Sequence, residues 1–521
     1  MKRARAALNG REIGITLTSK QGAMRMIERK GKSGLLVAGA VLMAVPVAAL
    51  SAQGQAGSVL PAQERPINGK HGLGKMPNVR PEASPAPQPS ALPSNAPHPV
   101  PSATPTPGAT PAPSPTASAS PAPATVTVVN PVPVAPWTVE DASDLLAAIT
   151  TIGAEGLFPA DYQPEALRAA IAAGPGVALD EQASRSFDWL VEDLRDGRTP
   201  VPARIQWFAV DPDQDLTPTE ALLKQATTNH DVPGTLAALA PVYPDYAALK
   251  EALATTPKAD VKRREAIRIN MDRWRWLPRD LGKIYLITNV PEFQLRLSVN
   301  GRIIRSYRTV VGKPGKTATP QLAETVQAVV FNPTWTVPQS IVVGEGLGEK
   351  LIGDPASALR QGYKVTRLGD GTINVVQQPG DKNSLGRMKI DMPNPHAIYL
   401  HDTPSKALFN AQLRAFSHGC IRTDRAVELG MTMAILGAGM SQEEAVATFE
   451  SKKYSRVKMT RTFPVYLTYV TMGVDVTGQL TSFGDIYGRD APVAASFRQP
   501  RQPHTSQRAS NEAVIKLDNP L

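Results

Sequence analysis

The hydrophobic residues between positions 137 and 280 recur at steps of three and four. This spacing places them on one face of an α-helix, and Gly197 follows one such run in the position of a helix stop. No obvious polar site interrupts these faces, so we expect a mainly helical scaffold domain over 137–280 with the stripes as its core. The stripes are Ala142, Leu145, Leu146 and Ile149; Phe187, Leu190, Val191 and Leu194; and Leu236, Leu239, Tyr246 and Leu249.

After Pro278 the period changes to two. Apolar residues from Phe293 to Val299 alternate with polar ones, and Asn300-Gly301 follows as a strong β-hairpin signal. The pattern predicts an α+β chain, in which the helical domain precedes a β-rich domain over 281–490 with a helical capping excursion at about 339–385. Further strands are expected at 328–331, 373–377, 397–400 and 464–471.

Both ends of the chain lack these periods. Residues 1–52 hold an apolar run at 34–50 that follows nine basic and two acidic residues, which is typical of a secretory signal peptide or a membrane anchor. Either alternative places the remainder outside the cytoplasm. Residues 53–136 are rich in Pro, Ala and Ser and predict a disordered, extended linker. Residues 491–521 are polar and predict a disordered tail.

The formal net charge of +10 does not indicate a nucleic-acid-binding protein. Residues 1–32 alone contribute +7, so the basic charge belongs mainly to the targeting segment. The remainder is nearly balanced, and the hydrophobic content of 42% is enough for a packed core. We therefore expect no nucleic-acid partner.

The chain has a single cysteine, Cys420, which cannot form an internal disulfide. A lone cysteine is usually a buried small hydrophobe, but His401 and His418 lie within about 20 residues of it. A thiol needs a nearby base or positive field to act as a nucleophile. Residues 423–429 are expected to begin a helix whose dipole would favour the thiolate. Gly419 would allow a close approach of backbone amides to a substrate.

Metal binding and chance clustering are the alternatives for this group. His418 and Cys420 lack a usual zinc spacing, and the chain has no second cysteine. We expect no metal and no cofactor.

The segment from His401 to Arg422 resembles the signature of the YkuD-type L,D-transpeptidases. In that family a histidine precedes Ser/Thr-His-Gly-Cys by about 15 residues, and an apolar residue with Asn or Arg follows. The segments around Trp274 and Gly156 are similar to the lead-in and the helical scaffold domain of the large Gram-negative, YcbB-type members. The matching residues are His401, Ser417, His418, Gly419, Cys420, Ile421 and Arg422, supported by Asn383-Ser384-Leu385-Gly386, Lys389 and Met392-Pro393-Asn394.

This resemblance implies an acyltransferase with Cys420 as nucleophile. Cys420 would attack the carbonyl of the diaminopimelate at position three of a tetrapeptide stem, release D-alanine and form a thioester, and a second stem amine would give a 3→3 cross-link. His401 would be the proton donor and acceptor. His418 would orient or polarise, with a role as the base as its alternative. Asp402 is either a third triad member or a solvated charge.

The resemblance also implies roles for the surrounding residues. Ser417 would hydrogen-bond a histidine, and backbone amides of Gly419 and Cys420 with Tyr399 nearby would hold the oxyanion. Arg422 would bind a stem carboxylate, or alternatively form a salt bridge at the helix start.

The expected partners are therefore peptidoglycan tetrapeptide stems, with carbapenems as inhibitors and the N-terminal segment as a possible membrane attachment. The expected location is the periplasm. An L,D-carboxypeptidase, or a transpeptidase that attaches a lipoprotein, would use the same site and stays an alternative. A papain-type peptidase is disfavoured because it needs Cys before His in the chain, whereas His401 precedes Cys420.

Overall fold

The computed structural model describes residues 132–211, 213–461, 463–503 and 512, except the side chains of 214 and 215, and the backbone of 3–8 and 11–16. The predicted apolar run at 34–50 and the linker up to residue 131 lie outside the described residues. Two compact units are present, 1–115 and 116–521. In the first, strands β1 (Arg3–Leu8) and β2 (Arg11–Thr16) pair antiparallel.

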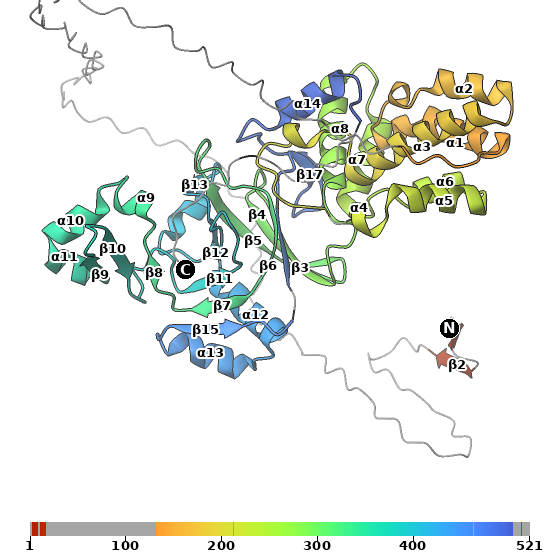
Figure 1. Ribbon diagram of the computed structural model, residues 1–521. Coiled ribbons are helices and arrows are strands. Elements are labelled where there is room, and N and C mark those ends of the chain that lie inside the picture. The colour runs from red at the N-terminus through yellow and green to blue at the C-terminus, as the bar shows by residue number, and fades with distance from the viewer. Residues whose placement is uncertain are drawn as a thin grey trace, which may run out of the picture. The chain divides into compact units, whose positions relative to one another are not determined.

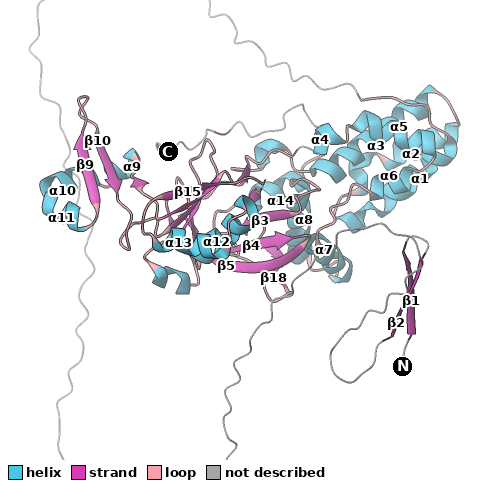
Figure 2. Cartoon of the chain, turned by 90° about the horizontal axis from the view of Figure 1, so that it is seen from below, coloured by secondary structure: helices cyan, strands magenta, loops and turns pink. Residues whose placement is uncertain are grey.

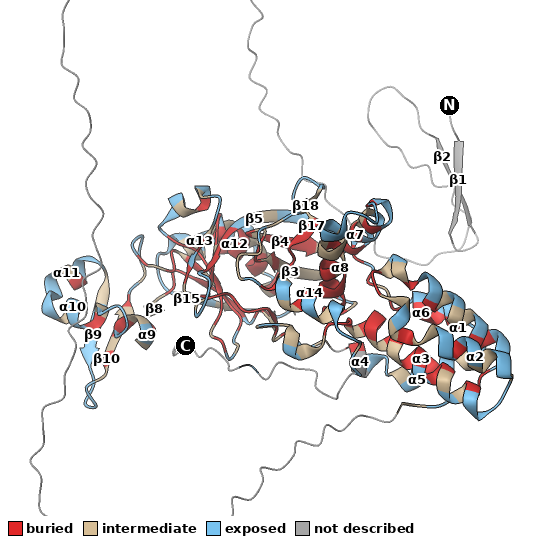
Figure 3. Ribbon diagram, turned by 90° about the horizontal axis from the view of Figure 1, so that it is seen from above, coloured by how far each residue is buried: buried red, intermediate tan, exposed pale blue. Residues whose placement is uncertain are grey.

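The second unit begins with a helical region whose hydrophobic stripes face one another. The stripes predicted in α1 and α3 are confirmed, because Leu145, Ile149, Phe187 and Leu190 are fully buried in one cluster. Figure 3 shows the buried residues on the inner sides of these helices. The helices are α1 (Val139–Thr151), α2 (Pro164–Ala173), α3 (Val177–Asp196), α4 (Asp213–Leu216), α5 (Thr219–Asn229), α6 (Val232–Ala237), α7 (Pro244–Thr255) and α8 (Val261–Arg275).

Helix α8 joins the helical region to the sheet that follows. Asp272 on α8 is fully buried and accepts hydrogen bonds from the backbone N–H groups of Arg198 (2.8 Å) and Thr199 (3.1 Å). Gly197 precedes them with φ +86°, and a Cβ there would lie 2.6 Å from the Trp276 indole nitrogen. The predicted helix stop at Gly197 is therefore confirmed, and it is also a point of close approach that requires glycine.

A sheet of eleven strands forms the second half of the unit (Figure 2). Its strand order is β15-β7-β11-β12-β14-β5-β4-β3-β16-β6, with β13 beside β5. The bounds are β3 (Ile284–Asn289), β4 (Gln294–Val299), β5 (Arg302–Gly312), β6 (Leu322–Thr325), β7 (Ala328–Phe331), β11 (Met388–Asp391), β12 (Leu400–His401), β13 (Ala415–Ser417), β14 (Ile421–Thr423), β15 (Ser455–Lys458) and β16 (Pro464–Thr468); β17 (Met472–Val474) and β18 (Leu480–Ser482) pair separately.

The predicted hairpin at Asn300-Gly301 is confirmed. Val299 pairs with Arg302 across the turn, and both turn residues have positive φ, 49° and 72°. A two-residue turn with this geometry matches the twist of the flanking strands. The predicted α+β class therefore holds at the level of both the helical region and the sheet.

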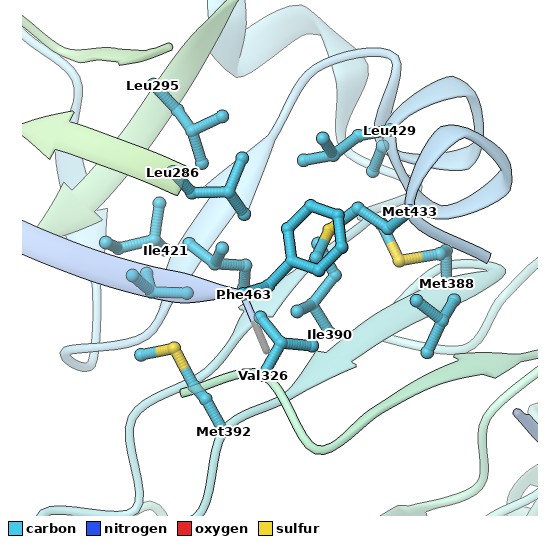
Figure 4. Packing of buried hydrophobic residues seen from close by; sticks show 14 of the residues in the cluster. Leu286, Leu295, Val326, Met388, Ile390, Met392, Ile421, Leu429, Met433 and Phe463 are labelled. Carbon is cyan, nitrogen blue, oxygen red and sulfur yellow. The ribbon is translucent and has the colours of Figure 1, made fainter. Parts of the chain in front are cut away.

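The core of the sheet lies between its strands and helix α12 (Ala426–Ala438), which packs on β7, β11 and β15. Figure 4 shows the Phe463 ring among Val326, Ile390 and Met433. Ile421 belongs to the same cluster and is fully buried. The residue that follows Cys420 thus fixes this segment to the core.

A small substructure is inserted between β7 and β11 (Figure 1). It has its own apolar cluster, and Asn332 and Arg387 hold its two ends together through a backbone hydrogen bond of 2.9 Å and two side-chain hydrogen bonds. The capping excursion of the predicted fold is therefore present, and it contains strands as well as helices. Its elements are β8 (Trp335–Thr336), α9 (Gln339–Val342), α10 (Leu347–Gly353), α11 (Pro355–Arg360), β9 (Tyr363–Arg367) and β10 (Ile373–Gln377).

The prediction of a disordered tail from residue 491 is wrong for its first part. Helix α14 (Asp490–Arg498) buries Val493 and Ala494. Arg501 then pairs with Glu192 (2.6 Å) and with the fully buried Asp193 (3.0 Å) on α3. The polar composition of 491–521 hid both contributions to order, the apolar burial of Val493 and Ala494 in α14 and the ion pairs of Arg501 with α3. The described part of the chain also contains helix α13 (Gln442–Glu450). Within the same described residues, none of the helices combines the length and apolarity needed to cross a bilayer.

Candidate active site

Two neighbouring parallel strands bring the predicted histidine and cysteine together. In β12 and β14, Leu400 pairs with Ile421 and His401 pairs with Arg422. Leu400 and Ile421 point into the core, so His401 and Arg422 point to the opposite face, because side chains alternate along a strand. Cys420 begins this segment, and its thiol donates a hydrogen bond to the carbonyl of Ala397 at 3.6 Å.

The helix predicted to begin over residues 423–429 is present, but it begins later than its first predicted residue. Residues 421–423 form β14, and α12 starts only at Ala426, after Arg425 with φ 44°. Asp424 keeps this segment extended, since its carboxylate accepts the N–H of Arg308 (2.8 Å) on β5. Cys420 therefore lies at the start of a central strand, and no helix N-terminus stabilises its thiolate.

The turn before Cys420 is held by hydrogen bonds within itself. Ser417 donates to the carbonyl of Cys420 (2.6 Å) and accepts from the N–H of Gly419 (3.1 Å). The expectation that Ser417 hydrogen-bonds a histidine is therefore wrong, because its hydroxyl is used inside the turn. The expectation for the Gly419 amide as an oxyanion donor is corrected as well, since that N–H already has a partner. Gly419 has φ +120°, and its carbonyl accepts from Thr319 Oγ1 at 2.7 Å.

His401 is buried and held in one orientation. Its Nδ1–H donates to the carbonyl of Asp402 at 2.5 Å, which leaves Nε2 as the proton acceptor. Its ring lies edge-on to Tyr399 with a centroid distance of 5.5 Å. Burial, aided by the charges of Arg422 and Lys389, lowers the pKa of His401 to about 3. His401 is therefore a neutral imidazole at physiological pH.

The surroundings of Cys420 favour its neutral thiol over the thiolate. Burial raises the pKa of its thiol to about 11, although hydrogen bonds from the backbone and side chain of Tyr399 and the charges of Lys389 and Arg422 act in the opposite direction. Because the pKa of His401 is low and that of Cys420 is high, the resting pair is uncharged. The cysteine can attack only as its proton moves to a base.

The neutral pair lies within a row of cationic side chains. Lys389 on β11 and Arg422 on β14 pair with His401 from its two sides. Lys389 is partly neutralised by Asp391 at 3.3 Å and lies 4.4 Å from the Tyr399 ring centre. Arg422 has a buried Nε without a hydrogen-bond partner in the described part of the chain, and burial lowers its pKa. The alternative of a helix-start salt bridge for Arg422 is thereby not realised.

The Asp402 carboxylate has neither of its two expected roles. It is buried, accepts the N–H of Arg387 at 3.0 Å and forms an ion pair with Lys406. It therefore fastens the exit of the inserted substructure to strand β12, while its backbone carbonyl orients His401. Sequence reasoning could not distinguish the carbonyl from the carboxylate as the partner of the histidine.

His418 lies in the turn that leads to Cys420 and faces the inserted substructure. Its side chain is 41% exposed, and its Nε2 is 2.9 Å from the carboxylate of Glu345 in the inserted substructure. No pattern in the sequence pointed to Glu345, which lies 73 residues upstream of His418 in a segment without a motif. Lys389 supports the resemblance of the sequence to the YkuD-type L,D-transpeptidases, but that resemblance implied no role for it.

Comparisons with known proteins agree with this site. Residues 283–429 match the family described as the L,D-transpeptidase catalytic domain, YkuD, and residues 136–253 match the family described as the Scaffold domain. A Haemophilus influenzae protein named as an L,D-transpeptidase is 28% identical over 244 residues, which are 44% of this chain and 49% of that protein. The chain thus spans about half the length of the curated relative that it matches. The predicted boundaries 137–280 and 281–490 stay predictions.

Solved structures of L,D-transpeptidases are similar over a smaller part. One from Mycobacterium smegmatis has 18% identity, covers 36% of this chain and 58% of that chain, and gives a TM-score of 0.18. L,D-transpeptidase 3 from Mycobacterium tuberculosis, in complex with a faropenem-derived adduct, has 15% identity, covers 36% and 60%, and gives 0.19. Together with the two family matches, the strands that carry His401 and Cys420 show that this chain contains a helical scaffold domain followed by a catalytic domain of the L,D-transpeptidase family.

Proposed function

We propose that the protein is a peptidoglycan L,D-transpeptidase that forms 3→3 cross-links between tetrapeptide stems through a thioester on Cys420. The observation that carries this proposal is the geometry of β12 and β14, which places His401 beside Arg422 and next to the segment that Cys420 begins, with the buried Nε of Arg422 without a hydrogen-bond partner among the described residues. Such a site suits an anionic acyl donor, and the catalytic-domain family supports acyl transfer at this thiol.

Acylation begins when the stem carbonyl reaches Cys420. The thiol proton moves to Nε2 of His401 as sulfur forms its bond to carbon, so neither group has to be charged beforehand. The imidazolium then returns the proton to the amine of the departing D-alanine. The low pKa of His401 makes the imidazolium a strong acid, which favours this second transfer.

Tyr399 is the proposed oxyanion donor, together with the Cys420 amide. Its backbone and side chain both hydrogen-bond the thiol, so they lie where negative charge develops on the substrate. Arg422 holds a stem carboxylate, because a guanidinium with an unpaired, buried N–H gains most from an anionic partner. Lys389 adds positive potential from the other side of His401.

The second half of the reaction transfers the acyl group to the side-chain amine of another stem. Water in its place gives an L,D-carboxypeptidase, and a lipoprotein amine gives an attached lipoprotein. The inserted substructure reaches the catalytic turn through Glu345 and His418 (2.9 Å). A cover at this position excludes water and favours the amine. We assign the activity to the periplasm, on the basis of the basic and apolar N-terminal segment.

Intact-protein mass spectrometry tests the proposal. Incubation with a tetrapeptide stem should add the acyl tripeptide to the wild type and nothing to Cys420→Ala, and a carbapenem should add its full mass to the same thiol. Analysis of the released peptides should show cross-linked dimers. Tripeptides alone would establish the carboxypeptidase, and the absence of any adduct would refute the thioester.

A further inference from the structure

The exposed His418 and the inserted substructure meet at the catalytic turn. Nε2 of His418 lies 2.9 Å from a carboxylate oxygen of Glu345, and both side chains are about half exposed, at 41% and 55%. The carboxylate can only accept, so Nε2 donates to it, and in the neutral imidazole Nδ1 is then the acceptor. The structure records no partner for Nδ1 in the described part of the chain. His401 has the opposite arrangement, with Nδ1 protonated and Nε2 as the acceptor.

Glu345 is presented by a constrained segment. It lies between α9 and α10, where Gly344 and Gly346 flank it. A Cβ on Gly344 would lie 2.2 Å from the carbonyl of Ser340, and Gly346 has φ +65°. Position 344 therefore requires glycine, and the positive φ at position 346 favours it. The N–H of Glu345 donates to the carbonyl of Ile341 at 3.1 Å, which ties the segment to α9.

The charges on the two sides of the site differ in sign. Lys389 and Arg422 flank His401, while Asp391 and Asp402 are more than nine-tenths buried and paired with lysines. An anionic donor is attracted to that side. An acceptor amine is an ammonium ion at neutral pH, so the same cations repel it. Glu345 offers the acceptor an exposed negative charge beside Cys420's turn.

We propose that Glu345 and His418 form the acceptor subsite, which binds the ammonium group of the second stem and removes its proton. This inference rests on the proposed transpeptidase function and names its acceptor side. The ammonium loses one proton to Nδ1 of His418, and the lone pair of the resulting amine forms the C–N bond. The C–S bond breaks as the amide forms. The second proton passes through His401 to the departing sulfur, which restores the thiol.

The experiment measures dimer formation against the concentration of a tripeptide acceptor that has a free side-chain amine. Glu345→Gln should raise the acceptor KM and lower its kcat/KM by at least about tenfold, because it removes one charge-assisted hydrogen bond. Transfer to hydroxylamine, which is uncharged at neutral pH, should change less than threefold. The matched control is Glu349→Gln on α10, whose partner Arg367 (2.9 Å) lies in the same substructure. This control should behave as the wild type does.

The outcomes separate the two proposals. Unchanged dimer formation by Glu345→Gln would overturn the acceptor subsite, and so would an equal loss with both nucleophiles, which would indicate only a role in positioning the inserted substructure. A wild type that forms the thioester but yields only tripeptide would overturn the transpeptidase function itself, and the acceptor subsite with it. Loss of the amine reaction alone supports the inference.

Discussion

Two buried threonines near the active site allow a sharp test of what holds the catalytic turn. Thr319 is fully buried, and its hydroxyl donates to the carbonyl of Gly419 (2.7 Å) and accepts the N–H of Gly312 (2.9 Å). Thr309 on β5 is also fully buried, but its hydroxyl has no hydrogen-bond partner in the described structure. Substitution by valine keeps the shape of the side chain at both positions. It removes two hydrogen bonds at Thr319 and none at Thr309 within the described structure.

Thr319→Val should destabilise the protein by about 2–4 kcal/mol. The substitution removes two hydrogen bonds and leaves one buried carbonyl and one buried N–H unsatisfied, each costing about 1–3 kcal/mol before the structure relaxes. Thr309→Val should be neutral or stabilising by up to about 1 kcal/mol, since it removes a hydroxyl that already lacks a partner. The expected difference of at least about 2 kcal/mol corresponds to roughly 4–8 °C in melting temperature for a domain of this size.

Thr319→Val should also lower the rate of thioester formation by about tenfold or more, because Gly419 no longer has a fixed carbonyl and Cys420 follows it directly. Thr319→Ser keeps the hydroxyl and should recover the rate to within a few-fold. Thermal melting and the time course of carbapenem acylation by intact mass measure both quantities. Equal melting temperatures and equal acylation rates for Thr319→Val and Thr309→Val would refute the assigned role of Thr319.

Three further predictions concern Cys420, Arg501 and Asn332. With a thiol pKa of about 11, alkylation of Cys420 by iodoacetamide at pH 7 should be roughly 300-fold slower than alkylation of a free thiol with a pKa of about 8.5. The alkylation rate should still rise above pH 9. A plateau of this rate below pH 9 would contradict the raised pKa. Arg501→Ala should cost about 3–5 kcal/mol because it leaves Asp193 buried without its cation, whereas Arg498→Ala, at an exposed ion pair, should stay within about 1 kcal/mol; equal melting curves would argue against the docked tail. Asn332→Ala should lower the free energy of unfolding in urea by about 2–4 kcal/mol. Asn332 donates to two backbone carbonyls, accepts from the Arg387 guanidinium and has φ 50°. A decrease below about 0.5 kcal/mol would contradict the role of Asn332 in holding the ends of the inserted substructure together.

Local patterns in the sequence predicted the elements that are stabilised locally. The stripes of α1 and α3 and the Asn300-Gly301 turn each depend on residues within a few positions of one another. The strand at 421–423 was missed for the opposite reason. Its three residues have no period of their own, and they become a strand because β12 and β5 lie on either side of them.

The candidate site was predictable as a set of residues and not as a set of interactions. The resemblance of the segment from His401 to Arg422 was enough to name both His401 and Cys420, and the structure places His401 in β12 and Cys420 directly before the adjacent strand β14. The partners of Ser417, Gly419 and Asp402 were assigned wrongly or left open. Each partner depends on a turn geometry or on a strand from elsewhere in the chain, and a single sequence does not reveal these.

The state of the catalytic pair shows most clearly why the rest could not be predicted. A histidine next to a cysteine suggests an ion pair, and a helix start beneath the cysteine would have stabilised its thiolate. Burial favours the neutral form of both His401 and Cys420. The cations Lys389 and Arg422 lower the pKa of His401 further, whereas at Cys420 they offset only part of the rise in pKa that burial causes. The same cations are favourable for an anionic donor and for the oxyanion. In the proposed mechanism the site has no preformed thiolate, and the positive potential of Lys389 and Arg422 acts when the negative charge of the substrate arrives. This arrangement requires the three strands β11, β12 and β14 to lie side by side.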